Sequence, residues 1–186
     1  MNVYDFDHTI YPGDSTLDFW RHCVGRHPAA LLSLPGAVLS GAMFQAGLRS
    51  REQFKGQFYR FLRRIPDVEG EVSRFWAQNR ARIYPWYLDR RREDDLIISA
   101  SPEFLIRPVC ALLGVRAIAS PVSPKTGELL GPNCRGEEKA VRLRREYPGL
   151  SVEEFYSDSV SDAPLAALAD RAFLVRGGIP SPWPQL

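Results

Sequence analysis

Short apolar runs alternate with helical patterns along much of this 186-residue chain. The runs predict five strands, at residues 1–6, 95–100, 116–119, 153–157 and 171–175. Amphipathic periodicity predicts helices between them, at residues 102–113, 137–147 and 162–169. Strands that alternate with helices are typical of a parallel sheet covered on both faces, so the pattern predicts an α/β fold. The proline-rich residues 180–184 are expected to form an irregular tail.

The long stretch between the first two predicted strands contains no comparable strand pattern. Ser15 and Asp18 resemble a capping box for a helix that reaches about residue 26, and Ser50 and Gln53 resemble another. A further amphipathic stretch covers residues 68–83, and a β-hairpin is expected later in the chain, at 122–131. We therefore expect an all-helical insert. Its bounds are 13–84, within a core formed by 1–12 and 85–186.

The helix expected to begin after Ser50 carries its apolar and basic residues on different sides. The apolar stripe consists of Phe54, Phe58, Phe61, Leu62 and Ile65. The basic residues that lie mostly opposite are Arg51, Lys55 and Arg63. This separation is typical of an amphipathic helix that packs by its apolar side.

Composition places the chain among ordinary globular proteins, with 45% apolar and 25% charged residues. The net charge of +2 is too small to indicate nucleic acid as a partner. The three cysteines, Cys23, Cys110 and Cys134, show no CxxC spacing, which disfavours a zinc site or a disulfide framework and favours a reducing cytosol. An acidic motif stands where the basic part of a secretory signal would lie, so we expect a cytoplasmic location. The sequence does not specify an oligomeric state.

The most informative polar residues directly follow the first predicted strand. Asp5 and Asp7 are separated by Phe6, so both carboxylates leave the strand end on the same side. Two carboxylates held together repel each other and need a cation or a shared proton. Such a pair supports a nucleophile and a general acid/base beside bound Mg²⁺. A solvated acidic turn is the alternative interpretation of the pair alone.

Three later segments accompany this pair in a fixed order. Residues 96–99 are an apolar run that ends in a hydroxyl, and residues 136–139 open an amphipathic helix. Residues 155–162 are an apolar run that ends in two spaced carboxylates. Together with Asp5 and Asp7, these segments resemble the four motifs of the haloacid dehalogenase superfamily, most closely those of its phosphoserine-phosphatase-like branch. The resemblance implies a Rossmann-like parallel sheet core with a helical cap inserted after the first motif.

The resemblance also implies a role for each polar residue of the motifs. Asp5 would attack phosphorus to form an aspartyl-phosphate, and Asp7 would act as general acid and then general base. Ser99, Lys139 and Thr9 would be the phosphate-binding residues, with Thr9 also orienting the loop that carries the two aspartates. Considered alone, Ser99 could be a helix cap, Lys139 a solvated helix residue and Thr9 a turn hydroxyl.

The same resemblance implies a Mg²⁺ site. Asp5 and Asp158 would each supply a carboxylate, and Asp7 would supply its backbone carbonyl. Asp162 could bind the metal directly, bind it through water or hold Lys139. Ser157 departs from the family pattern, because a glycine usually precedes the metal-binding aspartate. Among the hydroxyls near Ser99, Ser101 is the expected cap of the helix that follows.

These expectations together predict a Mg²⁺-dependent phosphomonoester hydrolase. Its substrate would be a small phosphorylated metabolite or a lipid-headgroup phosphate, because the cap is rich in Phe, Trp and apolar runs. One alternative is a phosphoserine phosphatase or phosphotransferase that acts on a polar substrate. Another is a catalytically silent binding module, although the intact set of carboxylates argues against it.

Residues 28–48 contain no charged side chain. The length would nearly span a bilayer, but Pro35 and Gly36 interrupt it, so two short buried helices are expected. Membrane contact is the alternative that we do not favour, because neither flank is rich in Lys or Arg. The residues expected to point partly toward the mouth of the active site are Leu31, Leu32, Val38, Met43 and Phe44.

Overall fold

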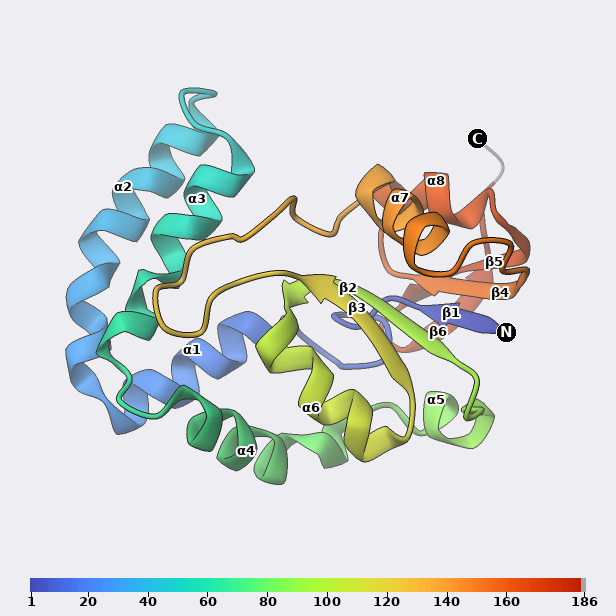
Figure 1. Cartoon of the computed structure of the whole chain (residues 1–186), viewed down its shortest axis with the longest axis horizontal. Helices are drawn as coiled ribbons and strands as arrows, with labels where there is room; N and C mark the ends of the chain where they lie inside the picture. Colours follow the sequence, from blue (N-terminus) through green and yellow to red (C-terminus); the bar gives the residue numbers. More distant parts are fainter. Residues whose placement is uncertain (185–186) are drawn as a thin grey trace.

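A computed structural model of the chain describes residues 1–184. Its centre is one sheet with the strand order β3-β2-β1-β4-β5-β6 (Figure 1). The strands are β1 (Asn2–Tyr4), β2 (Leu96–Pro102), β3 (Arg116–Ser120), β4 (Val152–Ser157), β5 (Ala169–Arg176) and β6 (Ile179–Pro182). The first five strands are parallel, and β6 runs antiparallel to β5. The predicted α/β fold with a Rossmann-like core is therefore confirmed.

Two pairs of helices cover the two faces of the sheet. The helices α7 (Glu137–Glu146) and α8 (Ala163–Ala166) lie on one face, and α5 (Pro85–Arg90) and α6 (Glu103–Leu113) lie on the other (Figure 1). Neighbouring residues of β1 serve the two faces, because side chains alternate along a strand. Val3 packs with Leu143 and Leu165 under α7 and α8, whereas Tyr4 packs with Ile106 on the side of α6.

The tail and the hairpin differ from their predicted structures. Proline led us to expect an irregular tail, but Pro180 and Pro182 lie in β6 at the edge of the sheet. An edge strand tolerates proline because its outer face needs no N–H donor for a further strand. Residues 122–131 form a turn closed by a single bridge between Val122 and Leu129 instead of two paired strands.

The regular elements between β1 and β2 are all helical, and every residue there is described. They are α1 (Ser15–Arg26), the 3₁₀ helix η1 (Pro28–Ser33), α2 (Leu34–Gln45), α3 (Arg51–Phe58), η2 (Tyr59–Arg64), α4 (Val68–Asn79) and η3 (Arg80–Arg82), with α5 after them. The predicted capping box at Ser50 is confirmed, since both of its hydrogen bonds with Gln53 are present. The one predicted at Ser15 is wrong. Asp14 caps α1 instead, by accepting a hydrogen bond from the Leu17 N–H at 2.9 Å.

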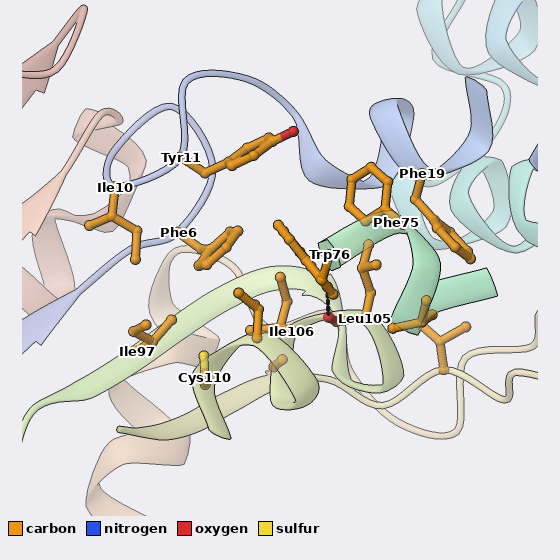
Figure 2. Close-up of a cluster of buried hydrophobic side chains, with 14 of the residues drawn as sticks. Phe6, Ile10, Tyr11, Phe19, Phe75, Trp76, Ile97, Leu105, Ile106 and Cys110 are labelled. Atoms are coloured by element: carbon orange, nitrogen blue, oxygen red, sulfur yellow. Dashed lines mark hydrogen bonds between the residues drawn. The ribbon is translucent and has the colours of Figure 1, made fainter. Parts of the chain in front are cut away.

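Part of the insert packs as tightly as the sheet itself. Trp76 of α4 lies edge-on against both Phe6 and Tyr11, with ring centroids 5.6 Å apart in each case (Figure 2). Its indole N–H donates to the Leu105 carbonyl of α6 at 2.7 Å. The two ends of the insert meet nearby, where the Tyr84 N–H donates to the carbonyl of Ile10 at 2.9 Å. The first and last helices of the insert therefore share one hydrophobic cluster with the sheet.

A buried carboxylate joins α4 to α1. Glu71 is 1% exposed and contacts His22 and Arg26 of α1, His27 directly after α1, and Arg74 of its own helix, all at 2.9 to 3.0 Å. Burial alone would raise the pKa of Glu71, but the hydrogen bonds from these four side chains hold it well below its ordinary value of 4.5. Glu71 is therefore ionised in the folded protein wherever the chain is near neutral pH.

We expect Glu71→Gln to lower the free energy of unfolding by about 2–3 kcal/mol at neutral pH, because a buried charge-assisted network is lost. A carboxyl whose folded pKa is depressed stabilises the protein above its unfolded pKa. That stability is lost as the pH falls below about 4.5. Urea unfolding across pH should therefore show a smaller acid-side loss in the variant than in the wild type. Glu69→Gln, on the exposed side of α4, is the matched control and should change little. Equal stability of the Glu71 variant and the wild type would contradict this account.

Candidate active site

A cavity opens at the carboxyl ends of the parallel strands. In this sheet the chain moves from β1 outward to β2 and β3, then returns to the other side of β1 with β4. Ligands of open α/β sheets bind at such a reversal of strand order. The cavity has a volume of about 410 Å³. Its lining includes Asp5, Asp7, Lys139, Asp158 and Asp162.

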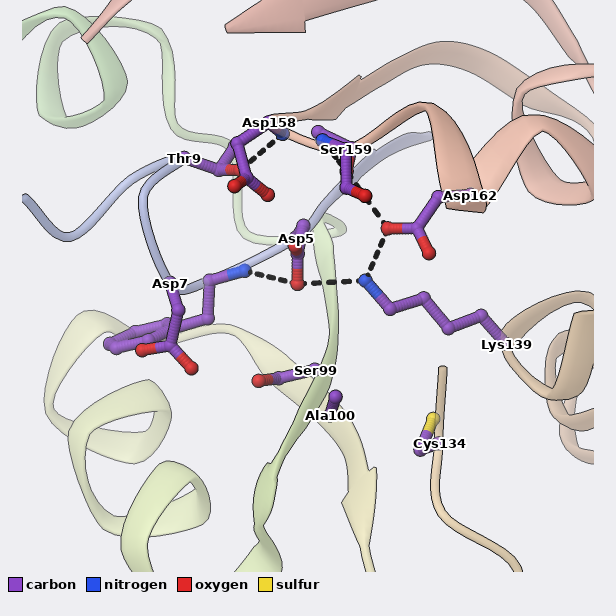
Figure 3. A network of polar contacts seen from close by, with 12 residues as sticks. Asp5, Asp7, Thr9, Ser99, Ala100, Cys134, Lys139, Asp158, Ser159 and Asp162 are labelled. Atoms are coloured by element: carbon purple, nitrogen blue, oxygen red, sulfur yellow. Dashed lines mark hydrogen bonds and ion pairs between the residues drawn. The ribbon is translucent and has the colours of Figure 1, made fainter. Parts of the chain in front are cut away.

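A buried lysine connects two of these carboxylates (Figure 3). The Lys139 ammonium lies 2.8 Å from Asp5 and 2.7 Å from Asp162, and the side chain is 1% exposed. Asp162 also accepts hydrogen bonds from the Ser157 hydroxyl at 2.8 Å and the Gly136 N–H at 3.1 Å. Both oxygens of Asp162 are thus engaged within the protein. Asp162 therefore holds Lys139, and its binding of a metal, directly or through water, stays a prediction.

The charges of this cluster do not balance. Burial raises the pKa of Asp5, and Asp162 and Asp158 raise it further, whereas Lys139 opposes the shift. Burial also raises the pKa of Asp158, which lies close enough to Asp5 to interact with it directly. Burial alone would lower the pKa of Lys139, but Asp5 and Asp162 hold it above its ordinary value. A charged lysine thus serves three carboxylates, which favours an additional cation.

The donors around Asp5 fit a small hard cation. Within residues 1–184, no three His, Cys, Asp or Glu side chains converge as one metal-ligand set. Asp5 and Asp158 nevertheless bring carboxylate oxygens together at the cavity, with Asp162 turned toward Lys139. Mg²⁺ is commonly bound by one or two carboxylates, with water and substrate phosphate completing its octahedron. The residues present therefore suit Mg²⁺ better than a metal that requires an all-protein cage.

Asp7 lies apart from the lysine and is held by two donors. The Ser15 N–H donates to one carboxylate oxygen at 2.7 Å, and the Ser101 hydroxyl donates to the other. Burial raises the pKa of Asp7 and the nearby Asp14 adds to the shift, while these two hydrogen bonds oppose it. The prediction that Ser101 caps the following helix is wrong. Pro102 occupies the capping position of α6 without a side-chain bond, and the Ser101 hydroxyl faces the active site.

Thr9 and Ser99 lie behind the cavity wall. The buried Thr9 hydroxyl accepts a hydrogen bond from the Asp158 N–H at 2.9 Å, so it joins the loop after β1 to the loop after β4. Ser99 is fully buried, and its hydroxyl accepts a hydrogen bond from the Ser101 N–H at 3.1 Å. Neither residue is among those that line the cavity. Their phosphate-binding roles stay predictions, and the structure shows both of them organising the loops that carry the aspartates.

The opposite wall of the cavity comes from α1 and α3. Phe54 and Phe58 of α3 line it together with Arg51 and Lys55, so both the aromatic and the basic sides of this helix adjoin the cavity. Lys55 donates to the Ala100 carbonyl at 2.8 Å and to the Asn133 side chain at 2.7 Å. Burial lowers its pKa to about 8. Sequence reasoning did not assign these residues to the site, because helical periodicity does not indicate which side meets the sheet.

The uncharged stretch does not form this wall. The prediction that it reaches the mouth of the active site is wrong, since the cavity lining contains none of Leu31, Leu32, Val38, Met43 and Phe44. Its division into two short helices is confirmed, with η1 followed by α2. Its predicted burial is wrong, because only Ala30, Ala37 and Ser40 are buried in η1 and α2.

Comparison with known proteins agrees with this fold and site. The family model of haloacid dehalogenase-like hydrolases matches residues 3–167. The chain belongs to this family. Among its relatives is the protein CicA of Caulobacter vibrioides, which is 33% identical over 90% of this chain and 82% of CicA.

Solved structures show the same architecture. A protein of unknown function from Bordetella pertussis has a TM-score of 0.76 at 22% identity, covering 92% of this chain and 87% of that one. A probable phosphoserine phosphatase from Vibrio cholerae has a TM-score of 0.63 at 17% identity, covering 92% and 55% of the two chains. A substrate-bound phosphoserine phosphatase has a TM-score of 0.54 at 16% identity, covering 91% and 82%. The fold is therefore that of the phosphoserine-phosphatase-like branch.

Proposed function

We propose that this hydrolase is a Mg²⁺-dependent phosphomonoesterase that works through an aspartyl-phosphate on Asp5. The observation that carries the proposal is the ion pair between Asp5 and the buried Lys139, with Asp158 directly beside it. A carboxylate held next to a cation at the carboxyl end of a strand is positioned to approach a phosphorus atom in the cavity. Mg²⁺ held by Asp5, Asp158 and the Asp7 carbonyl would neutralise charge on the phosphate oxygens.

Asp5 performs the first step. One of its carboxylate oxygens attacks phosphorus, and the bond between phosphorus and the ester oxygen breaks with its electron pair leaving on that oxygen. Lys139 remains beside Asp5 and offsets the negative charge of the phosphoryl group. Asp7 supplies the proton that the leaving oxygen needs. Its raised pKa favours the protonated form that this role requires.

Asp7 also performs the second step. As a carboxylate it takes a proton from water, whose oxygen attacks the phosphorus of the aspartyl-phosphate. The bond between Asp5 and phosphorus breaks, which restores the Asp5 carboxylate and releases inorganic phosphate. The Ser15 N–H and the Ser101 hydroxyl hold Asp7 in one orientation for both proton transfers.

The cavity wall supports a phosphate ester whose leaving group is partly apolar. Leu17, Phe54 and Phe58 offer apolar surface, and Arg51 and Arg135 add positive charge at the same cavity. A volume of about 410 Å³ accommodates a small metabolite or the headgroup end of a lipid phosphate. The residues of this wall are the basis for proposing these two classes of substrate, whereas the aspartates are the basis for proposing the reaction.

Phosphate release from p-nitrophenyl phosphate tests the activity. We expect turnover with Mg²⁺, loss of turnover in excess EDTA and recovery when Mg²⁺ is restored. A panel with phosphoserine, short alkyl phosphates and lysophosphatidic acid then tests the leaving group. The proposal fails if the folded protein hydrolyses none of these compounds in Mg²⁺. Preference for phosphoserine over every apolar ester would support the proposed reaction but contradict the proposed class of substrate.

We expect Ser101→Ala to lower kcat by about tenfold, because Asp7 loses one of its two orienting donors. The hydrogen bond from Ser101 lowers the pKa of Asp7, so its removal should raise that pKa further. Asp7 would then remain protonated to higher pH. The alkaline limb of the plot of kcat against pH should therefore shift to higher pH. Ser101→Thr keeps the hydroxyl and should restore the wild-type profile. An unchanged pH profile in Ser101→Ala would contradict this role.

A further inference from the structure

The helix α2 is exposed on the side where its large apolar residues lie. Val38 and Leu39 are 67% and 63% exposed, while Ser40 beside them is 1% exposed. Leu32 in η1 and Leu48 after α2 are also largely exposed. This distribution is the reverse of that of an ordinary surface helix, which buries its leucines and exposes its serines. We call Leu31, Leu32, Val38, Leu39 and Leu48 the outer cap face.

The opposite side of α2 is fixed against α3. A Cβ atom added to Gly36 would lie 2.3 Å from the Gln57 side chain, and one added to Gly41 would lie 3.3 Å from Phe54. These short distances place Gly36 and Gly41 on the side of α2 that packs against α3. Rotation of α2 about its axis to bury Val38 and Leu39 would break this contact with α3. The outer cap face is a stable property of the fold.

Positive charge lies at the end of this hairpin. No Asp or Glu occurs between Asp18 and Glu52, whereas Arg49 follows Leu48 and Arg51 lies two residues further on. The Arg49 guanidinium donates to the Ser40 hydroxyl of α2 at 3.0 Å. The Arg51 guanidinium lies 5.4 Å from the centre of the Phe44 ring, near the C-terminal end of α2, and Arg51 also lines the active-site cavity. Figure 1 shows α2 and α3 as a hairpin at the edge of the molecule, away from the sheet. An apolar face with arginines at its tip complements an anionic membrane surface.

We propose that the outer cap face docks on the surface of an anionic lipid bilayer. The segment Pro28–Gln45 has a mean hydropathy of 1.2 over 18 residues, of which 17% is buried, and by length and composition it could cross a membrane. Crossing would carry Arg51, Glu52 and Lys55 of the attached α3 into the hydrocarbon, where charges are costly. Shallow insertion places the leucines among the acyl chains and the arginines at the headgroups.

A bilayer explains this face better than a second copy of the chain. Symmetric association through the tip would bring the two sets of Arg49 and Arg51 together, which like charges oppose. An anionic lipid leaflet offers the opposite charge. It is also fluid, so it can cover an exposed apolar helix without a matching binding surface. Docking does not depend on the catalytic assignment, and its test reads binding alone.

The test is co-sedimentation of the full chain with vesicles of phosphatidylcholine, with and without phosphatidylglycerol, at low and high salt. We expect binding to the phosphatidylglycerol vesicles that weakens in high salt. The double variant Val38→Glu, Leu39→Glu should lower the partition coefficient at least about tenfold, because two inserted side chains become charged. Leu112→Glu on α6, where the leucine is 60% exposed, is the matched control and should bind as the wild type does.

A fluorescent label reports insertion without a charged substitution. The three native cysteines are buried, so Val38→Cys offers one exposed thiol for an environment-sensitive dye. Its emission should shift to the blue with phosphatidylglycerol vesicles, whereas the dye at Leu112→Cys should not shift. Wild-type protein that stays in the supernatant at low salt overturns the proposal, as does an unshifted label at position 38. A dimer that the double variant dissociates would assign the face to a second copy and would also overturn it.

Discussion

Asp5→Asn is expected to lower kcat by at least about 10⁴-fold, because an amide cannot form the acyl-phosphate on which both steps depend. The fold should survive, since the change removes one of three carboxylates around Lys139 and leaves its 2.7 Å contact with Asp162. We therefore expect an unfolding temperature within a few degrees of the wild type, measured beside single-turnover phosphate release. This combination separates a chemical defect from a folding defect.

The control for this variant is the same chemical change at a remote position. Asp67→Asn alters the exposed residue that caps α4, and asparagine is an equally good cap. We expect wild-type turnover from it. A folded Asp5→Asn protein with near-normal turnover would show that Asp5 is not the nucleophile. A labelled phosphoenzyme in the wild type, absent from this variant, is the positive counterpart.

Lys139→Met should have the largest effect on stability, a loss of about 3–5 kcal/mol in the free energy of unfolding. Methionine fills much of the volume of the lysine stem but leaves the Asp162 carboxylate, 1% exposed, without its counter-charge. Asp5 loses its 2.8 Å partner at the same time, so kcat should fall by about 10²-fold or more. Urea unfolding and steady-state kinetics measure the two effects. Lys125→Met, at an exposed turn, should change neither.

A second substitution tests the cause of this instability. Asp162→Asn removes the buried charge while its side-chain oxygen can still accept from the Gly136 N–H. If the uncompensated carboxylate is responsible, the double variant Lys139→Met, Asp162→Asn should be more stable than Lys139→Met alone. A double variant that is less stable, by the sum of the two single changes, would exclude this explanation.

The parts of the site that could be predicted from the sequence depend on the order of neighbouring residues and on the parallel pairing of the strands. Asp5 and Asp7 are two residues apart at the end of β1, and β4 pairs with β1 in parallel, so Asp158 had to emerge at the same edge. Lys139 was predictable only through its motif, since an isolated lysine on a helix is ordinarily solvated. The fold class followed from the alternation of strands and helices for the same reason: both patterns are properties of neighbouring residues.

The parts that could not be predicted depend on how elements far apart in sequence meet. Ser101 had the local features of a helix cap, but the approach of Asp7 from β1 determines the partner of its hydroxyl. Lys55 had the spacing of a solvated residue, but its contact with the Ala100 carbonyl of β2 leaves it half-buried. In α2, composition suggested burial, whereas the glycine contacts with α3 turn Leu39 outward. No periodicity within one segment contains this information.

The aromatic cluster of Figure 2 limits how the cap could be exchanged between relatives. The ends of the insert meet at Ile10 and Tyr84, which by itself would suit the transplantation of the whole insert as a cassette. Trp76, however, packs against both Phe6 and Tyr11. A chimera joined at those ends would therefore replace Trp76 and remove its contacts with these two rings. The hairpin of α2 and α3 carries little of that cluster, while its helix α3 supplies Arg51, Phe54, Lys55 and Phe58 to the cavity wall. Recombination confined to residues 34–58 would therefore exchange part of the cavity wall and leave both the aspartates and the aromatic cluster in place.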